Sequence, residues 1–122
     1  MGIRINDHIK VFVLQEELNM RFPYLKLEFF AKIQAGNREF LKKLTRLDDI
    51  IVVEHNNDQS KGEISIDPEM TVRELEQKFK EIYGLEIKLF RKSGKLWLET
   101  TITDSWTLDQ QNREGEALSK DS

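Results

Sequence analysis

The sequence predicts an α+β fold made of two tandem strand–helix–strand–strand (βαββ) units, followed by a short C-terminal helix. Two observations carry this prediction. Residues 3–22 align with residues 64–83 at matching apolar positions, and two alternating stretches typical of strands follow in each copy. We expect each unit to be a small mixed sheet with one main helix, because an internal repeat in sequence indicates a repeated unit of structure. The strands of the two units either join into one sheet or form two small sheets that pack in pseudo-twofold fashion.

The alignment of the two copies depends on identities and on apolar positions that agree. Four pairs are identical: Ile3/Ile64, Ile5/Ile66, Val11/Val72 and Leu14/Leu75. Three further apolar residues, Ile9, Leu18 and Phe22, align with Met70, Phe79 and Tyr83. After the deletion of one residue, LKLEFFAK (25–32) falls on LEIKLFRK (85–92). The agreement of the apolar positions indicates one architecture for both halves.

The helix of the second copy has clear start and stop signals. Thr71 is followed three residues later by Glu74, which is a capping-box pattern. Gly84 is the residue type that most often ends a helix. Between these signals one apolar stripe runs at helical spacing: Val72, Leu75, Phe79 and Tyr83.

The helix of the first copy is less clearly marked. IKVFV (9–13) is rich in β-branched residues and by itself could be a strand. The repeat favours a helix, since Val11, Leu14, Leu18 and Phe22 copy the spacing of the second helix. We therefore expect a helix, and a strand over residues 9–13 would contradict the repeat.

Each copy then continues as a hairpin. In the second, a turn at Ser93-Gly94 pairs Phe90 with Trp97 and Leu89 with Leu98. In the first, a three-residue loop at 34–36 pairs Phe30 with Phe40 and Phe29 with Leu41. We expect parallel, right-handed pairing within each strand–helix–strand crossover. The predicted core is Ile3, Ile5, Leu14, Leu18, Leu27, Phe29, Ile64, Ile66, Leu75, Phe79, Ile87, Leu89 and Leu98.

We expect one compact domain with four segments. They are a first βαββ unit (1–55), a linker (56–62), a second unit with the short C-terminal helix (63–114) and a disordered tail (115–122). The stretch 47–55 is compatible with a short helix or a strand. Thr107 and Gln110 form a second capping-box pattern, so Trp106 either anchors the last helix or contacts a partner.

One resemblance rests on the second half of the chain. GEISIDPEMTVRELEQKFKEIYGLEIKLF together with TDSWTLDQQNREG resembles a group of small uncharacterised bacterial proteins with tandem, loosely ubiquitin-like βαββ units. The resemblance covers roughly residues 60–115. It implies the architecture described above and a bacterial cytosolic origin, but it implies no activity.

Composition and charge narrow the function classes. The 122 residues contain no cysteine, and no apolar run approaches the ~20 residues of a membrane span. We expect a cytoplasmic protein with no membrane partner. The net charge is −3, all of it carried by residues 104–122, so the body is neutral. This balance is not that of a basic nucleic-acid binder.

No motif indicates catalysis, a metal or a cofactor. Glu54, His55 and Asp58 are donor residues near one another in sequence, but no second cluster completes a metal site. No Gly-rich phosphate loop or nucleophile motif is present. We therefore predict no catalytic or metal residues, no cofactor and no enzymatic activity.

The aromatic residues are the candidate contact residues: Phe30, Phe40, Phe90, Trp97 and Trp106. The hairpin pairs among them are either covered by 47–55 and 107–113 or exposed as a docking face, since aromatic side chains dominate interface hot spots. We predict a non-catalytic protein–protein interaction module, an adaptor or regulatory subunit with an unidentified protein partner. A homodimer is compatible with it. RNA binding through the hairpin aromatics is the alternative, although we do not expect a nucleic-acid partner.

Overall fold

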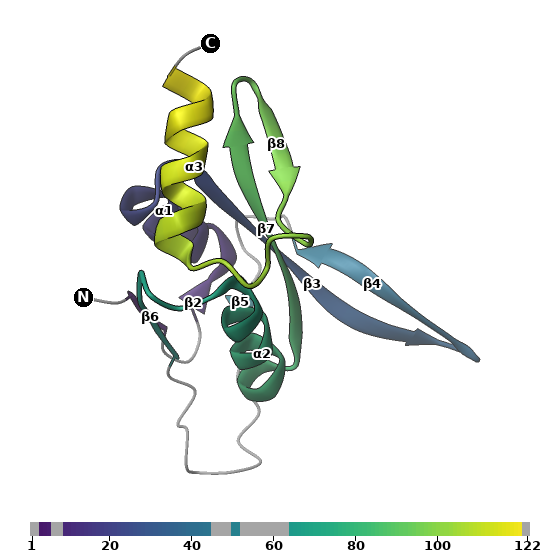
Figure 1. The fold of residues 1–122 in the computed structure, drawn as a ribbon. Helices are drawn as coiled ribbons and strands as arrows, with labels where there is room; N and C mark the ends of the chain where they lie inside the picture. The colour runs from purple at the N-terminus through teal and green to yellow at the C-terminus, as the bar shows by residue number, and fades with distance from the viewer. Residues whose placement is uncertain (1–2, 6–8, 45–49, 52–63, 121–122) are drawn as a thin grey trace.

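A computed structural model describes residues 3–5, 9–44, 50–51 and 64–120, with side chains described over 11–44 and 65–120. Figure 1 shows helices gathered on one side of a curled sheet whose two hairpins extend in different directions. The elements in chain order are β1 (Ile3–Ile5), β2 (Ile9–Lys10), α1 (Val11–Arg21), β3 (Leu25–Ala35), β4 (Arg38–Leu44), β5 (Ile50–Ile51), β6 (Ile64–Ile66), α2 (Val72–Tyr83), β7 (Leu85–Ser93), β8 (Leu96–Glu99) and α3 (Leu108–Lys120).

The main sheet has four antiparallel strands in the order β4-β3-β7-β8. Its centre joins the two halves of the chain, with Leu27 paired to Leu89 and Phe29 to Ile87. The parallel crossover pairing that we predicted is wrong, because β1 pairs antiparallel with β6 instead of lying beside β3. The two longest strands of this sheet, β3 and β7, take the central positions, where each pairs with a strand along both of its edges.

Residues 9–13, for which the sequence allowed a strand or a helix, divide between the two. Ile9 and Lys10 form a short strand, which pairs with β5, and the helix begins at Val11. Only the two residues of β5 are described between 45 and 63, so the choice between helix and strand for 47–55 and the linker at 56–62 lie outside the described residues.

The first hairpin has a different register from the one predicted. The turn is Gly36-Asn37, with Gly36 at φ 65°, rather than a three-residue loop ending at Gly36. Phe40 therefore pairs with Ile33, and Phe30 pairs with Lys43. A shift by an odd number of residues exchanges the faces of a strand. Phe40 consequently lies on the opposite face from Phe30.

The turn of the second hairpin lies one residue later in the chain than predicted. Gly94-Lys95 form the turn, so Trp97 pairs with Lys92 and Leu98 with Arg91. This shift moves each pairing by two residues and preserves the faces. Trp97 therefore shares a face with Phe90, as predicted. Leu98 is 39% exposed because no described helix covers β8, so its assignment to the core is wrong.

The core lies between the helices and one face of the sheet. Phe79 of α2 packs edge-on against Phe29 of β3, with ring centroids 5.3 Å apart. Side chains of Ile3, Ile5 and Ile64 lie outside the described ones. The other predicted core residues are buried: Leu14, Leu18, Leu27, Phe29, Ile66, Leu75, Phe79, Ile87 and Leu89. Val11, Phe22, Leu25, Val72, Tyr83 and Leu108 complete the cluster.

Helix α1 completes the edge of β3 that β4 leaves open. The β3–β4 pairing ends at Phe29, so the first residues of β3 have no strand on that side. Gln15 donates its side-chain amide to the carbonyl of Leu27 (2.9 Å), and Asn19 donates to that of Leu25 (3.0 Å). Two amide side chains thus replace the missing strand, because buried carbonyl groups need donors.

The N-termini of α2 and α3 cap one another. The first N–H groups of a helix have no partner within it. Thr71 and Thr107, the residues before the two helices, form an isolated antiparallel bridge. Four backbone hydrogen bonds surround it: Val72 N–H to Trp106 O (3.1 Å), Arg73 N–H to Asp104 O (2.9 Å), Leu108 N–H to Met70 O (2.8 Å) and Asp109 N–H to Pro68 O (3.0 Å).

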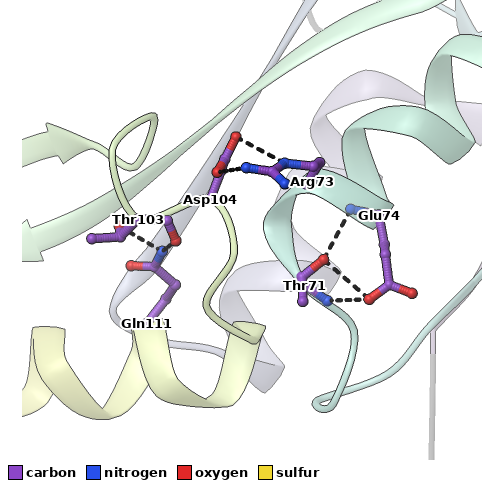
Figure 2. A network of polar contacts seen from close by, with 6 residues as sticks. All are labelled: Thr71, Arg73, Glu74, Thr103, Asp104 and Gln111. Atoms are coloured by element: carbon purple, nitrogen blue, oxygen red, sulfur yellow. Dashed lines mark hydrogen bonds and ion pairs between the residues drawn. The ribbon is translucent and has the colours of Figure 1, made fainter.

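Side chains reinforce this junction. Both predicted capping boxes are present: Thr71 with Glu74 and Thr107 with Gln110. Figure 2 shows the first box beside the ion pair of Arg73 with Asp104, whose shortest N–O distance is 2.8 Å. These contacts fix where α3 leaves the sheet and which face it covers.

Helix α3 corrects one expectation and bears on one alternative that the sequence left open. It runs to Lys120, so the tail that we expected to be disordered from residue 115 is helical as far as Lys120. It also packs beside Arg91 of β7, on the side of the other helices, and so does not cover Phe90 or Trp97. Gly115 explains the close packing, because a Cβ there would lie 2.8 Å from Cβ of Tyr24.

Candidate functional site on the open face of the sheet

The alternation of side chains divides the sheet into two faces. One face carries Leu27, Phe29 and Leu89 and packs against the helices. We call the other the open face. From the strand registers it consists of Lys26, Glu28, Phe30, Lys32, Gln34, Glu39, Leu41, Lys43, Glu86, Lys88, Phe90, Lys92, Trp97 and Glu99.

Aromatic rings and lysines interleave on the open face. The ammonium of Lys26 lies 5.7 Å from the ring centroid of Trp97 and 5.9 Å from that of Phe90. Lys92 lies 5.9 Å from the Trp97 ring on the same strand pair. Lys88 lies 5.5 Å from the ring of Phe30. These distances are within the range of cation–π attraction, which holds the rings in place on the sheet.

Most lysines of the open face are also paired with glutamates. Glu28 is almost fully buried and forms ion pairs with Lys26 (3.5 Å) and with Lys43. Lys88 pairs with Glu99 at 3.2 Å. Lys32 lies 3.8 Å from both Glu39 and Glu86. The open face is therefore nearly neutral rather than uniformly basic, with Phe30 and Phe90 on either side of the charged residues Glu28 and Lys88 on the two central strands.

A groove borders the open face where α1 replaces the missing strand. It has a volume of about 630 Å³, and we call it the α1 groove. Helix α1 forms one wall, and Trp97 lies on the other side. Met20 is 79% exposed there, an unusual position for a long apolar side chain. The lining residues are Phe12, Gln15, Glu16, Asn19, Met20, Lys26, Leu27 and Trp97.

The structure brings together three of the five candidate contact residues. Phe30, Phe90 and Trp97 share the open face. Phe40 lies on the other face near the tip of its hairpin and is 49% exposed. Trp106 is half-buried at the α2–α3 junction, where the guanidinium of Arg91 lies 5.4 Å from its ring centroid.

Sequence reasoning missed the residues that complete this site. Lys26 and Glu28 alternate with Phe30 along β3, so the period of a strand could have identified them. Met20 could not be found in this way, because its exposure depends on how α1 crosses β3. Arg91 of β7 does not belong to the open face, and donates to Gln111 (2.9 Å) beneath α3.

The resolved pKa shifts belong to residues at the helix junction and on α2. Hydrogen bonds from the backbone and the hydroxyl of Thr71 lower the pKa of Glu74. The hydrogen bond and charge of Asp104 raise the pKa of Arg73. Burial, with the negative charges of Asp104 and Glu86, raises the pKa of Glu76. These groups stabilise or strain the fold and do not form a proton-transfer site on the open face.

Among the described side chains no group of three His, Cys, Asp or Glu residues could hold a metal ion. No helix of the described segments is both long enough and apolar enough to cross a membrane. Comparison with models of protein families, with curated proteins and with solved structures gives no match.

Proposed function

We propose that this protein is a non-catalytic interaction module that binds a partner protein on its open face and in the α1 groove. One observation carries the proposal: Phe30, Phe90 and Trp97 share a sheet face that the described helices leave uncovered. Large aromatic side chains on a rigid surface contribute most of the binding energy in many interfaces.

The charges of the face favour a protein over a polyanion. Lys26, Lys43 and Lys88 already have carboxylate partners within the sheet. A nearly neutral surface on which paired charges alternate with aromatic rings is closer to a protein interface than to a basic nucleic-acid surface. Because these pairs also fix the side chains before binding, less conformational entropy is lost on association.

Affinity capture with matched variants tests the proposal. The full chain, tagged and carrying a photo-crosslinker at Lys92, should capture one protein reproducibly from its native cell extract. Trp97→Ala should abolish this capture. Leu118→Ala, which removes an exposed apolar side chain from α3, should leave it intact. Equal capture by wild-type protein and Trp97→Ala would contradict binding on the open face.

A second candidate is single-stranded RNA, favoured by the two lysines beside the Trp97 ring. Bases stack on such rings, and lysines can contact the phosphates. Fluorescence anisotropy with a labelled RNA of about ten nucleotides tests it. Affinity that falls steeply with salt and disappears in Trp97→Ala would replace the protein partner with RNA. No binding at low salt would eliminate this candidate.

We also infer that the two halves are a tandem repeat of one βαββ unit. The order β1-α1-β3-β4 followed by β6-α2-β7-β8 supports this inference, as do the two hairpins that meet at their first strands. The resemblance to bacterial proteins with ubiquitin-like units and the cytoplasmic location stay predictions.

A further inference from the structure

We propose that two copies of this chain pair along the free edge of β8, antiparallel and about a twofold axis at Trp97. The inference goes beyond the proposed function, because it concerns an edge of the sheet rather than its open face. In the described sheet β8 hydrogen-bonds to β7 alone, and all four of its residues are exposed. In Figure 1 its outer side faces away from β7 and α3.

The backbone of Trp97 points toward this free edge. Thr100 donates its N–H to the carbonyl of Leu89 (3.2 Å), so these two residues form a hydrogen-bonded pair of the β7–β8 ladder. Backbone groups alternate between the two sides of an antiparallel strand. Leu98 therefore directs its N–H and C=O at β7, and Trp97 directs its own outward. Unpaired outward groups are a template for a further strand.

The sequence around Trp97 is complementary to itself. The segment KLWLE (95–99) reads as cation, leucine, tryptophan, leucine, anion. In an antiparallel pair centred on Trp97, Leu96 lies opposite Leu98 of the second copy. Lys95 lies opposite Glu99 of the second copy, and twofold symmetry forms each pair twice. Opposite charges and apolar pairs directly across strands are stabilising.

This register also agrees with the direction of the backbone. Trp97 would face Trp97 of the second copy as a hydrogen-bonded pair, which requires outward N–H and C=O groups in both copies. A shift of two residues either way would place Trp97 opposite Lys95 or Glu99. Only the centred register matches charges and apolar side chains together.

Apolar surface on β8 provides the driving force. Leu96 is 66% exposed, Leu98 39% and Trp97 36%. Pairing would cover the leucines on one face of the extended sheet and bring the two tryptophans together on the open face. Burial of such apolar area is the main favourable term in association.

The opposite edge of the sheet is protected against the same pairing. Strand β4 carries three cations, Arg38, Lys42 and Lys43, against the single anion Glu39. Two copies of β4 would therefore repel each other, and lysines at an edge are a common device against strand pairing. Strand β8 with Lys95 carries one charge of each sign and has no such protection.

The dimer should be weak, because a four-residue strand buries less than the ~1,200 Å² of a standard interface. We expect a dissociation constant on the order of 0.1–1 mM for the full chain. Sedimentation equilibrium should therefore show a reversible monomer–dimer equilibrium up to about 1 mM protein. A chain that stays monomeric over this range would overturn the proposal.

Charge reversal tests the register. Lys95→Glu turns both Lys95–Glu99 pairs into repulsive pairs and should weaken the dimer about tenfold. Glu99→Lys alone should weaken the dimer too, and Lys95→Glu combined with Glu99→Lys should restore it relative to Glu99→Lys, because the pairs re-form with exchanged signs while both variants equally lose the contact of Glu99 with Lys88. Glu39→Lys on β4 is the matched control and should change nothing. Insensitivity of the dimer to Lys95→Glu, or a double variant that dimerises no better than Glu99→Lys alone, would overturn the proposed pairing.

Amide hydrogen exchange gives a second readout that needs no variant. The Trp97 amide should exchange more slowly as protein concentration rises, because pairing occupies its outward N–H. The Leu98 amide should not respond, since it already points at β7. Concentration-independent exchange at Trp97 would contradict pairing at this edge. Loss of the dimer would leave partner capture on the open face intact, so the two proposals fail separately.

Discussion

Gly115 shows how one residue sets the distance between two elements. An added Cβ would lie 2.8 Å from Cβ of Tyr24 and 3.2 Å from the carbonyl oxygen of Lys92. Neither atom is the end of a flexible side chain, so α3 would have to move away from β7. In the sequence this residue looks like a helix breaker before a tail, because a close approach between elements leaves no local signal.

We predict that Gly115→Ala destabilises the protein by ~1–3 kcal/mol, as overpacking does. Helix propensity alone would favour alanine by ~1 kcal/mol, so the sign of the change separates the two effects. Urea denaturation measures it. Ala117→Gly, at an exposed position of the same helix, isolates the propensity effect and should cost ~1 kcal/mol. A more stable Gly115→Ala variant would contradict the packing argument.

Glu76 provides a test by pH. Its raised pKa, caused first by burial and then by Asp104 and Glu86, means that folding favours the protonated form. Its contribution to stability is therefore present at low pH and is lost as pH rises through the folded-state pKa. We predict that Glu76→Gln melts at a higher temperature than wild type at pH 7, with the difference shrinking toward about pH 4. A pH-independent difference would contradict this origin.

At the scale of elements, the reciprocal caps couple α2 to α3. Each helix begins with hydrogen bonds from its first amides to the segment before the other helix. The capping boxes were predictable, because their signal lies within four residues of sequence. The contact between them was not, since Thr71 and Thr107 are 36 positions apart and only the folded chain brings them together.

We predict that Thr107→Ala lowers the free energy of unfolding by ~1 kcal/mol, the usual value of an N-cap. Thr107→Ser keeps the hydroxyl that accepts from the Gln110 amide (3.1 Å) and should retain most of the stability. Thr101→Ala, exposed in the preceding turn, is the control and should change it by less than ~0.5 kcal/mol. Thermal and urea melts would measure all three variants. An equal loss of stability in Thr107→Ala and Thr107→Ser would contradict a role of the Thr107 hydroxyl as the N-cap of α3.

The hairpins show the limit of local prediction at this scale. Both turns were placed next to the correct glycines, but each was displaced along the chain. In the second hairpin the strand register differs from the predicted one by two residues, so Trp97 stays on the face of Phe90. In the first hairpin the strand register differs by three residues, so Phe40 lies on the face opposite Phe30. Register depends on which residues the helices bury, and this information is not contained in the turn.

At the scale of the whole molecule, the two halves share one core. Leu27 and Leu89 come from different halves and pair across the centre of the sheet, and both are buried. Neither half has a buried cluster separate from this one among the described residues. The halves should therefore unfold together.

We predict a single unfolding transition in which Leu27→Ala and Leu89→Ala each lose ~2–5 kcal/mol. Circular dichroism and tryptophan fluorescence should give coincident curves for both variants. Leu96→Ala, largely exposed on β8, should lose less than ~0.5 kcal/mol at micromolar concentration. Two separated transitions would show that the halves fold as independent domains.

The sequence by itself determined the elements with local signals. Apolar periodicity and capping patterns predicted α2, the start of α3, the strands β3 and β7 and most of the buried residues. Each of these signals comes from residues that lie close together in the sequence. The tertiary structure decided what depends on distant partners. It paired β3 with β7, extended α3 to Lys120 through the close approach at Gly115, and left Phe90 and Trp97 uncovered by α3. Which face is covered follows from how helices cross a sheet, and no local pattern records that crossing.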